Sequence, residues 1–506
     1  MRRGAKHGAV MSEPKVARNY FGGKWVRSSD EKLLEVENPS TGEVIGRVVL
    51  SSAADVDRAV EAARGAFGPW SRTPLPGRVS SLYALRGLLL DHQEKISRTL
   101  CAEMGKSLPD ARAEMNRTVQ NVEAACGMPI LQHGDKMIGS AAGIDGEVIR
   151  LPLGVFAAIT PFNFPAMAPF WFLPYALATG NTFVLKPSEQ VPLTMALIAD
   201  LLDQTGLPPG VFNLVNGDKA AAEALVDHPG VRGVSFVGKS STCRAVASRC
   251  VALNKRCQAM GSAKNHLVVM PDFSKLDQLI RNMSTSCFGC AGQRCMASSA
   301  IVAIGDETYQ AVTERFVEDS KRFLVANPFD PSVADEPMLM GPVISADAKR
   351  FIVDMIARGV AEGATLALDG RDAVIPGGEN GHFLGPTVFT DVKPGMEIHR
   401  TELFGPVVVI LKAASLDGAI SIINEHQYAN ACSIYTQSGH YARKFKLEAE
   451  CGIIGVNVGI PAPVPFLPFG GMNDSMVGDV KMQGKAAVSF FAADKVIVER
   501  FGFGEW

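Results

Sequence analysis

The segment Phe288 to Met296, FGCAGQRCM, places Cys295 among small residues and directly after the guanidinium of Arg294. A neighbouring cation and backbone N–H dipoles lower the pKa of a cysteine, and the resulting thiolate is the form that attacks carbonyl carbon. Glycine and alanine leave room for a substrate to approach the sulfur. We therefore interpret Cys295 as an activated nucleophile. The alternative is a buried structural cysteine in a small-residue turn.

Cys287 and Cys290 form a C-x-x-C motif just before this residue, a spacing that also occurs in redox and metal sites. No second C-x-x-C follows to complete a zinc site, so we predict no metal. The role of these two thiols stays open. Ten cysteines in 506 residues, without the spacing of a disulfide scaffold, predict reduced thiols.

The composition, with 47% hydrophobic and 20% charged residues, predicts a globular protein of two or three domains. A formal net charge of -2 gives no support for nucleic-acid binding or for a polybasic membrane anchor. No apolar segment follows the basic residues of the first ten positions, and no apolar run has membrane-spanning length. We expect a cytoplasmic protein without nucleic-acid or membrane partners.

Two series of elements must position Cys295. We expect residues 1–17 to be a flexible tail, with the true start at Met1 or Met11, followed by a hairpin over 19–26 and helices over 53–67 and 78–104. Pro109 suits the first turn of a further helix. After Gly143, short apolar runs alternate with helical patterns, which predicts a parallel sheet covered by helices. Its strands are expected at 154–160, 181–185, 211–215 and 234–237.

A second α/β series follows, with strands expected at 267–270, 301–304, 388–390, 407–411, 433–435 and 453–456. Cys295 lies inside this series, and residues 259–262 link it to the first. We therefore expect the nucleophile to face a cleft between two domains, where ligand sites commonly occur. No G-x-G-x-x-G is present, so a dinucleotide would be held by a variant phosphate turn.

Four motifs occur in an order and at separations that resemble the aldehyde dehydrogenase superfamily: PFNFP at 161–165, KPSE at 186–189, GQRC at 292–295 and ELFGPV at 402–407. The resemblance covers about Tyr20 to Phe491. Within the superfamily it is strongest to the CoA-acylating methylmalonate-semialdehyde dehydrogenases, through stretches at 217–219, 261–272 and 455–458.

The resemblance implies an α/β fold with two α/β domains, one of them carrying a dinucleotide-binding parallel sheet, and a small oligomerisation extension. It assigns the NAD-binding domain to 18–262, with 136–154 as part of that extension. The catalytic domain follows at 263–465, and a C-terminal return and oligomerisation segment at 466–506. A homodimer or homotetramer is expected, and the sequence does not decide between them.

By the same resemblance, Asn163 joins Cys295 as a catalytic residue, because its side-chain amide would stabilise the oxyanion of the tetrahedral intermediate. A polar loop residue between two prolines is the alternative. The implied cofactor is NAD, and NADP is disfavoured because Glu189 would repel a 2′-phosphate. The chain departs from the family at Lys239 and Thr401, and their effect on cofactor affinity stays open. The implied cofactor-binding residues are Thr160, Phe162, Lys186, Glu189, Gly238, Glu402 and Phe404.

Arg117 and Arg294 match the arginines that bind the substrate carboxylate in the semialdehyde subfamily, a task that suits the planar guanidinium. For Arg117 the alternative is an ion pair with Glu114 at helical i,i+3 spacing. Trp171 matches a position of the aldehyde tunnel but is left out of the site because aromatic residues are common in cores.

The implied reaction is oxidation of malonate or methylmalonate semialdehyde through a cysteine thioester, with coenzyme A as co-substrate and acetyl-CoA or propanoyl-CoA as product. Ala259 stands where hydrolytic members have a glutamate that activates water. Residues 466–471 are closer to hydrolytic members, so a hydrolytic NAD-dependent aldehyde dehydrogenase of another aldehyde is one alternative. A non-catalytic cofactor-binding pseudoenzyme is the other. Which semialdehyde is used stays open.

Overall fold

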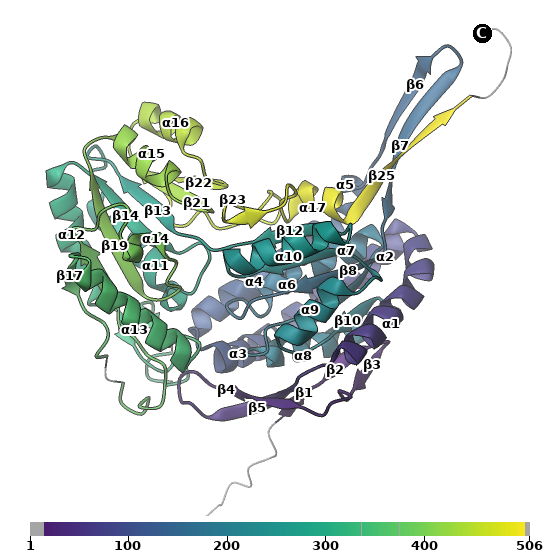
Figure 1. Cartoon of the computed structure of the whole chain (residues 1–506), viewed down its shortest axis with the longest axis horizontal. Coiled ribbons are helices and arrows are strands. Elements are labelled where there is room, and N and C mark those ends of the chain that lie inside the picture. The colour runs from purple at the N-terminus through teal and green to yellow at the C-terminus, as the bar shows by residue number, and fades with distance from the viewer. Residues whose placement is uncertain (1–14, 335, 374, 501–506) are drawn as a thin grey trace, which may run out of the picture.

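The computed structural model describes residues 15–334, 336–373 and 375–500. It consists of two α/β lobes, each built on its own sheet, and a long arm of three strands that projects away from them (Figure 1). Most of the predicted 1–17 tail lies outside the described residues. Its last three residues form a strand, so the prediction is wrong for that part.

The strands of the first lobe are β1 (Lys15–Ala17), β2 (Asn19–Phe21), β3 (Lys24–Val26), β4 (Leu33–Glu37), β5 (Val44–Val49), β8 (Val155–Ile159), β9 (Thr182–Lys186), β10 (Phe212–Leu214), β11 (Val231–Val237), β12 (Arg256–Met260) and β24 (Met476–Val477). The main sheet has the order β24-β12-β11-β8-β9-β10-β2-β3, and β1, β5 and β4 form a small separate sheet. The five strands from β12 to β10 pair in parallel. The central strands β8 and β9 are buried over their whole length, which explains their largely apolar sequences.

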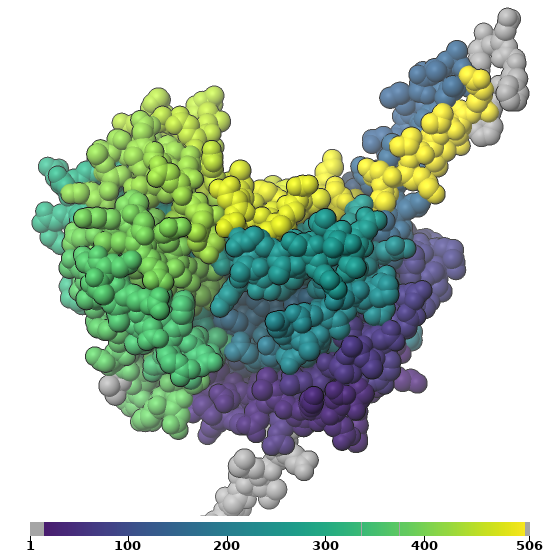
Figure 2. All heavy atoms as spheres, in the orientation of Figure 1, coloured from purple at the N-terminus to yellow at the C-terminus, as the bar shows by residue number. Residues whose placement is uncertain are grey.

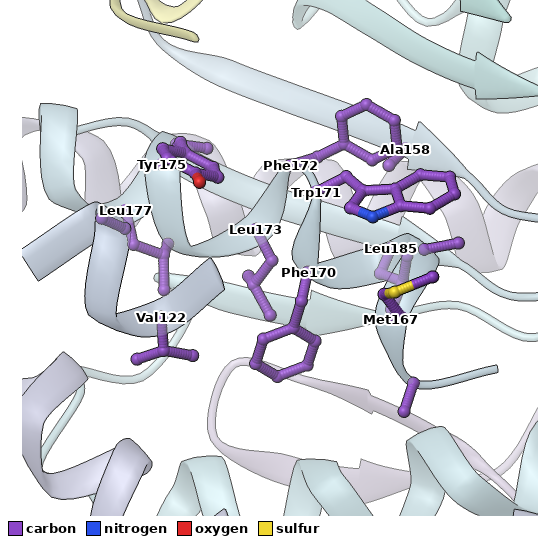
Figure 3. Close-up of a cluster of buried hydrophobic side chains, with 14 of the residues drawn as sticks. Val122, Ala158, Met167, Phe170, Trp171, Phe172, Leu173, Tyr175, Leu177 and Leu185 are labelled. Atoms are coloured by element: carbon purple, nitrogen blue, oxygen red, sulfur yellow. The ribbon is translucent and has the colours of Figure 1, made fainter. Parts of the chain in front are cut away.

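The helices of this lobe are α1 (Ala53–Arg72), α2 (Leu75–Asp91), α3 (Gln93–Met104), α4 (Leu108–Cys126), α5 (Met128–Leu131), α6 (Met167–Phe170), α7 (Leu173–Thr179), α8 (Pro192–Asp203), α9 (Lys219–Asp227) and α10 (Ser240–Ala252). One face of the sheet packs on a large apolar cluster that includes residues of α4, α6 and α7. Figure 3 shows part of this cluster, with Trp171 and Met167 at one end and Val122 and Leu177 at the other. The other face packs on α1 and α9.

The single helix predicted over 78–104 is two helices, α2 and α3, which meet at His92. The backbone of His92 leaves the helical region, and its ring nitrogen Nδ1 lies 3.0 Å from the carbonyl oxygen of Leu88. The ring nitrogen thus gives a carbonyl group at the end of α2 a hydrogen-bond partner at the point where the chain changes direction. The start of α4 follows the prediction, with Ser107 as N-cap and Pro109 in its first turn.

The second lobe contains β13 (Asn265–Val269), β14 (Ser298–Ile304), β15 (Leu324–Val325), β16 (Leu339–Met340), β17 (Thr365–Leu368), β18 (Thr387–Thr390), β19 (Val407–Ala413), β20 (Tyr428–Ala429), β21 (Ala431–Tyr435), β22 (Ile453–Val456) and β23 (Met472–Asn473). Its helices are α11 (Leu276–Phe288), α12 (Asp306–Ser320), α13 (Ala346–Ala361), α14 (Glu397–Arg400), α15 (Leu416–Asn424) and α16 (Gly439–Glu448). The main sheet has the order β17-β18-β19-β14-β13-β21-β22, and all its strand pairs are parallel except that of β17 with β18.

The C-terminal segment returns to the first lobe. There β24 pairs with β12, and after α17 (Gly484–Phe491) the strand β25 (Ala492–Glu499) enters the arm. It pairs with β7 (Ile144–Pro152), which also pairs with β6 (Asp135–Ala141). The arm stands clear of both lobes (Figure 2). We propose that the boundaries expected from the sequence, at 18–262, 263–465 and 466–506, divide this structure into its domains.

All ten cysteines lie in the described residues, and each is a free thiol. Among the helices of the described ranges, none is both long enough and apolar enough to cross a membrane.

Candidate active site

The loop that carries Cys295 begins where α11 ends. Cys290, Ala291 and Gly292 follow with φ values of 54°, 53° and 72°, three left-handed residues in a row. A Cβ atom on Gly292 would lie 2.2 Å from the carbonyl oxygen of Gly405, so only glycine fits there. The loop is thereby pressed against the Phe404–Gly405 turn of the same lobe.

Two asparagines hold the backbone of Cys295. Its carbonyl oxygen accepts hydrogen bonds from Nδ2 of Asn265, at 2.8 Å, and from Nδ2 of Asn430, at 2.9 Å. Asn265 begins β13, and Asn430 directly precedes β21, so two neighbouring strands fix the nucleophile. Sequence reasoning missed both residues, because nothing in the local sequence shows that they converge on position 295.

The thiol of Cys295 is not activated as the sequence predicted. Burial, and to a smaller extent the carboxylate of Glu402, together raise the pKa of Cys295 to about 12. Backbone N–H groups and Arg294 act in the opposite direction but do not compensate. The prediction of a lowered pKa is therefore wrong for this protein without ligands, and the thiol must lose its proton during the reaction.

Two cavities meet at Cys295. The larger, of about 270 Å³, is lined by apolar and aromatic side chains together with four charged residues, Asp110, Glu114, Arg117 and Arg294. The smaller, of about 20 Å³, lies between Cys295, Glu402 and Phe404. Trp171, left out of the site at first, lines the larger cavity, as do Phe164, Met167, Met296, Ile460 and Pro463. These residues come from both lobes, so Cys295 lies at the cleft between them.

The side chain of Asn163 reaches from the first lobe to the nucleophile loop. Its Nδ2 donates a hydrogen bond of 3.0 Å to the carbonyl oxygen of Gln293, two residues before Cys295. Gln293 is itself fixed, because its side chain accepts from the N–H of Ile344 and donates to the carbonyl of Pro342. A primary amide has two N–H donors, and the second remains for an oxyanion formed near Cys295.

Four of the residues assigned to NAD lie at the carboxyl ends of adjacent parallel strands: Thr160 after β8, Lys186 and Glu189 at the end of β9, and Gly238 after β11. Nζ of Lys186 lies 3.0 Å from Oε2 of Glu189. Gly238 precedes the thirteen-residue helix α10. Carboxyl ends of parallel strands and helix N-termini are where dinucleotides and their phosphates bind, so these residues fit NAD.

The other three residues assigned to NAD are Phe162, Glu402 and Phe404, where the proposed cofactor site borders the nucleophile loop. The rings of Phe162 and Phe404 come from opposite lobes and meet edge to face, with centroids 5.8 Å apart. Oε1 of Glu402 accepts a hydrogen bond of 2.9 Å from the N–H of Ala263. Burial raises the pKa of Glu402 to about 7, against the opposing effect of hydrogen bonds and of Lys264 and Lys239.

Both arginines assigned to the substrate line the larger cavity. Nη1 of Arg117 donates to Oε1 of Gln120 at 2.8 Å, while Glu114, its alternative partner, is bonded to Lys106. Nη2 of Arg294 donates to the carbonyl oxygen of Thr285 at 2.6 Å. The buried Nε of Arg294 has no hydrogen-bond partner, so this guanidinium retains a free donor beside the cavity.

The neighbouring residues Ala259 and Met260 of β12 pack on opposite faces of the sheet. Side chains alternate along a strand, and Ala259 packs into the apolar cluster of α1 and α9 on the far face of the sheet. Met260 instead belongs to the cluster that contains Cys295, Met296 and Trp171. The side chain of Ala259 therefore faces away from Cys295, and that of Met260 packs on the opposite face of the sheet. A thioether, like a methyl group, cannot act as a general base.

A partly buried cysteine between two α/β lobes, beside an amide donor and the carboxyl ends of parallel strands, is the arrangement expected of an enzyme that attacks a carbonyl compound through a covalent intermediate. The chain belongs to the aldehyde dehydrogenase family, whose sequence model matches residues 25–497. The family and the fold class predicted from the four motifs are confirmed.

Among its relatives, the chain is 42% identical to malonate-semialdehyde dehydrogenase 1 of Geobacillus kaustophilus over 491 residues, which cover 97% of this chain and 99% of that protein. Two solved structures have TM-scores of 0.94. One is a putative methylmalonate-semialdehyde dehydrogenase from Sinorhizobium meliloti 1021 complexed with NAD, 38% identical. The other is methylmalonate-semialdehyde dehydrogenase from Oceanimonas doudoroffii, 37% identical. Each alignment covers 97% of this chain and 99% of the other.

Proposed function

We propose that this protein oxidises malonate semialdehyde or methylmalonate semialdehyde with NAD and transfers the acyl group to coenzyme A. Support comes from relatives and solved structures named for these activities. The observation that carries the proposal is the cavity at Cys295, which is lined by Arg117 and Arg294 together with apolar side chains and two carboxyl groups, Asp110 and Glu114. Two guanidinium groups suit a substrate that bears a carboxylate.

In this mechanism the sulfur of Cys295 attacks the aldehyde carbon, and the N–H of Asn163 stabilises the oxyanion. Residues at the ends of β8, β9 and β11 would hold NAD, which would accept the hydride from the thiohemiacetal carbon and so leave a thioester on Cys295. The resulting thioester is attacked by the thiol of coenzyme A, which releases Cys295 and forms a new thioester. The malonyl or methylmalonyl group also loses its carboxylate as carbon dioxide and takes up a proton at the α carbon, which gives acetyl-CoA or propanoyl-CoA.

The hydrolytic alternative needs a base to activate water, and Met260 cannot supply one. Glu402, with its pKa raised to about 7, is the carboxyl group of the smaller cavity and keeps this alternative open to experiment. The pseudoenzyme alternative finds no support in the site, because the nucleophile, the amide donor and the nucleotide-binding strand ends all converge.

Arg117→Ala should reduce kcat/KM for malonate semialdehyde by about 10- to 100-fold, because a hydrogen bond to a charged group is lost. The rate with propanal, which has no carboxylate, should change little. Initial rates of NADH formation with both substrates measure this difference. Arg112→Ala, in the same helix but bonded to Glu94, is the matched control. Equal losses on both aldehydes would show that Arg117 does not select the acid.

Glu189→Gln should narrow the preference for NAD over NADP by about tenfold, because a neutral amide no longer repels a 2′-phosphate. The ratio of kcat/KM values for the two cofactors measures the effect. Glu223→Gln, on the exposed face of α9, is the control. If the ratio stays the same in Glu189→Gln, another group such as Lys239 sets the cofactor preference.

We also propose a cytoplasmic homodimer or homotetramer that assembles through the arm. Met137 and Ile138 of β6 and Val496 and Val498 of β25 are 63%, 80%, 69% and 68% exposed, so both strands that flank β7 carry exposed apolar side chains. Val496→Asp/Val498→Asp should shift the protein toward monomers in sedimentation velocity. The same distribution as the unchanged protein would mean that another surface holds the subunits together.

A further inference from the structure

A buried ion pair that the mechanism does not use lies beside the larger cavity. Nζ of Lys106 is 2.6 Å from Oε2 of Glu114, and both side chains are completely inaccessible to solvent. Lys106 follows the end of α3, and Glu114 lies on α4. Removing two charges from water is costly, and apolar residues of similar volume often serve stability as well. The pair therefore calls for an explanation other than stability.

The other polar contacts of this pair go to the segment that carries Asn163. Nζ of Lys106 donates 2.7 Å to the carbonyl oxygen of Asn163 and lies 4.4 Å above the ring of Phe164. Oε1 of Glu114 accepts from the N–H groups of Ala166 and Met167, at 2.9 and 3.0 Å. Asn163 is thus held by its carbonyl on one side and, through Gln293, by its side chain on the other.

We propose that Lys106 and Glu114 are positioning residues for the oxyanion amide of Asn163, fixing the loop after β8 so that its free N–H points at the reacting carbonyl. The proposal rests on the proposed role of Asn163 in aldehyde oxidation. An oxyanion donor is effective only when it is preorganised, and a misplacement of about 1 Å can cost about 100-fold in rate. Lys106 donates to the carbonyl of Asn163, and Glu114 accepts from the N–H groups that follow it, so this part of the loop is held at both ends.

The first test is Lys106→Met/Glu114→Gln, which removes both charges while keeping side-chain volume and an oxygen acceptor for Ala166 and Met167. Because no unpaired charge is left inside, the protein should fold with a melting temperature near that of the unchanged enzyme. The rate of the first NADH turnover should fall by about 100-fold, with little change in KM for aldehyde or NAD. Lys106→Arg, which keeps the charge but moves the donor, should show a smaller loss of the same kind. An unchanged first-turnover rate in either folded variant would overturn the proposal.

A mutant cycle separates positioning from a general structural role. Asn163→Ala removes the amide and should itself lower the first-turnover rate by about 100- to 1,000-fold. Adding Lys106→Met/Glu114→Gln to Asn163→Ala should then cost almost nothing more, because the pair acts through an amide that is already absent. Additive losses would show that the pair acts elsewhere and would refute the proposal.

Glu103→Gln is the matched control. Glu103 is equally buried and lies on α3, but its carboxylate caps α8 by accepting from the N–H groups of Leu193 and Thr194, at 2.6 and 2.9 Å. This variant should lower the melting temperature and leave the first-turnover rate unchanged. All rates are measured with propanal as well as malonate semialdehyde. If only propanal is oxidised, the assigned substrate is wrong while the cycle still tests the positioning role.

Discussion

Cys295→Ala is expected to abolish NADH formation while the protein remains folded and still binds NAD. The sulfur is the only atom removed, and both asparagines that hold position 295 contact its backbone carbonyl, which alanine retains. Loss of the nucleophile removes the covalent route entirely, so turnover should fall below detection. Stopped-flow absorbance of NADH measures the chemistry, and fluorescence titration with NAD measures binding.

Cys290→Ala is the control for this experiment. Cys290 also lines the larger cavity and has a left-handed backbone like its neighbour Ala291, so alanine is tolerated at that conformation. Burial raises the pKa of this thiol to about 12, and its N–H is bonded to Asp110, which gives it a structural environment. If both variants lost turnover equally while staying folded, the assignment of Cys295 as nucleophile would be wrong.

The motif chemistry of this protein could be read from its sequence because the relevant residues are close in the chain. The GQRC segment contains the nucleophile and a guanidinium of its cavity, and the apolar runs after Gly143 revealed the parallel strands whose ends carry Thr160 and Lys186. The alternation of side chains between the two faces of a strand was harder to predict than the strands themselves. On β12 it decides whether Ala259 or Met260 packs on the face of the sheet that belongs to the same cluster as Trp171, and a difference of one residue reverses the answer.

Contacts between residues far apart in the chain could not be predicted. Arg294 indicated a lowered pKa for Cys295, but desolvation by the closed cleft and the charge of Glu402 outweigh it. The pair of Lys106 and Glu114 was equally hidden, because i,i+3 spacing suggested Arg117 as the partner of Glu114. Only the folded chain brings α3, α4 and the loop after β8 together. Such contacts are set by tertiary packing and leave no local pattern.

The second large expected effect concerns the acyl acceptor, coenzyme A. Without coenzyme A, the enzyme should form a burst of about one equivalent of NADH per active site and then nearly stop, because neither Ala259 nor Met260 can act as a base that activates water for attack on the thioester. Absence of such a base costs about 100- to 10,000-fold in rate. Adding coenzyme A should restore steady turnover, with an acyl-CoA identified by mass spectrometry.

Met260→Glu should raise the slow hydrolytic rate, since glutamate is close to methionine in length and the buried position would raise its pKa toward that of an effective base. Met260→Gln has the same shape without a basic group and should leave hydrolysis slow. Both are measured as steady NADH formation without coenzyme A. Fast turnover of the unchanged enzyme to a free acid would instead establish the hydrolytic reaction. In that case, loss of this turnover in Glu402→Gln, with NAD binding retained, would identify Glu402 as the base.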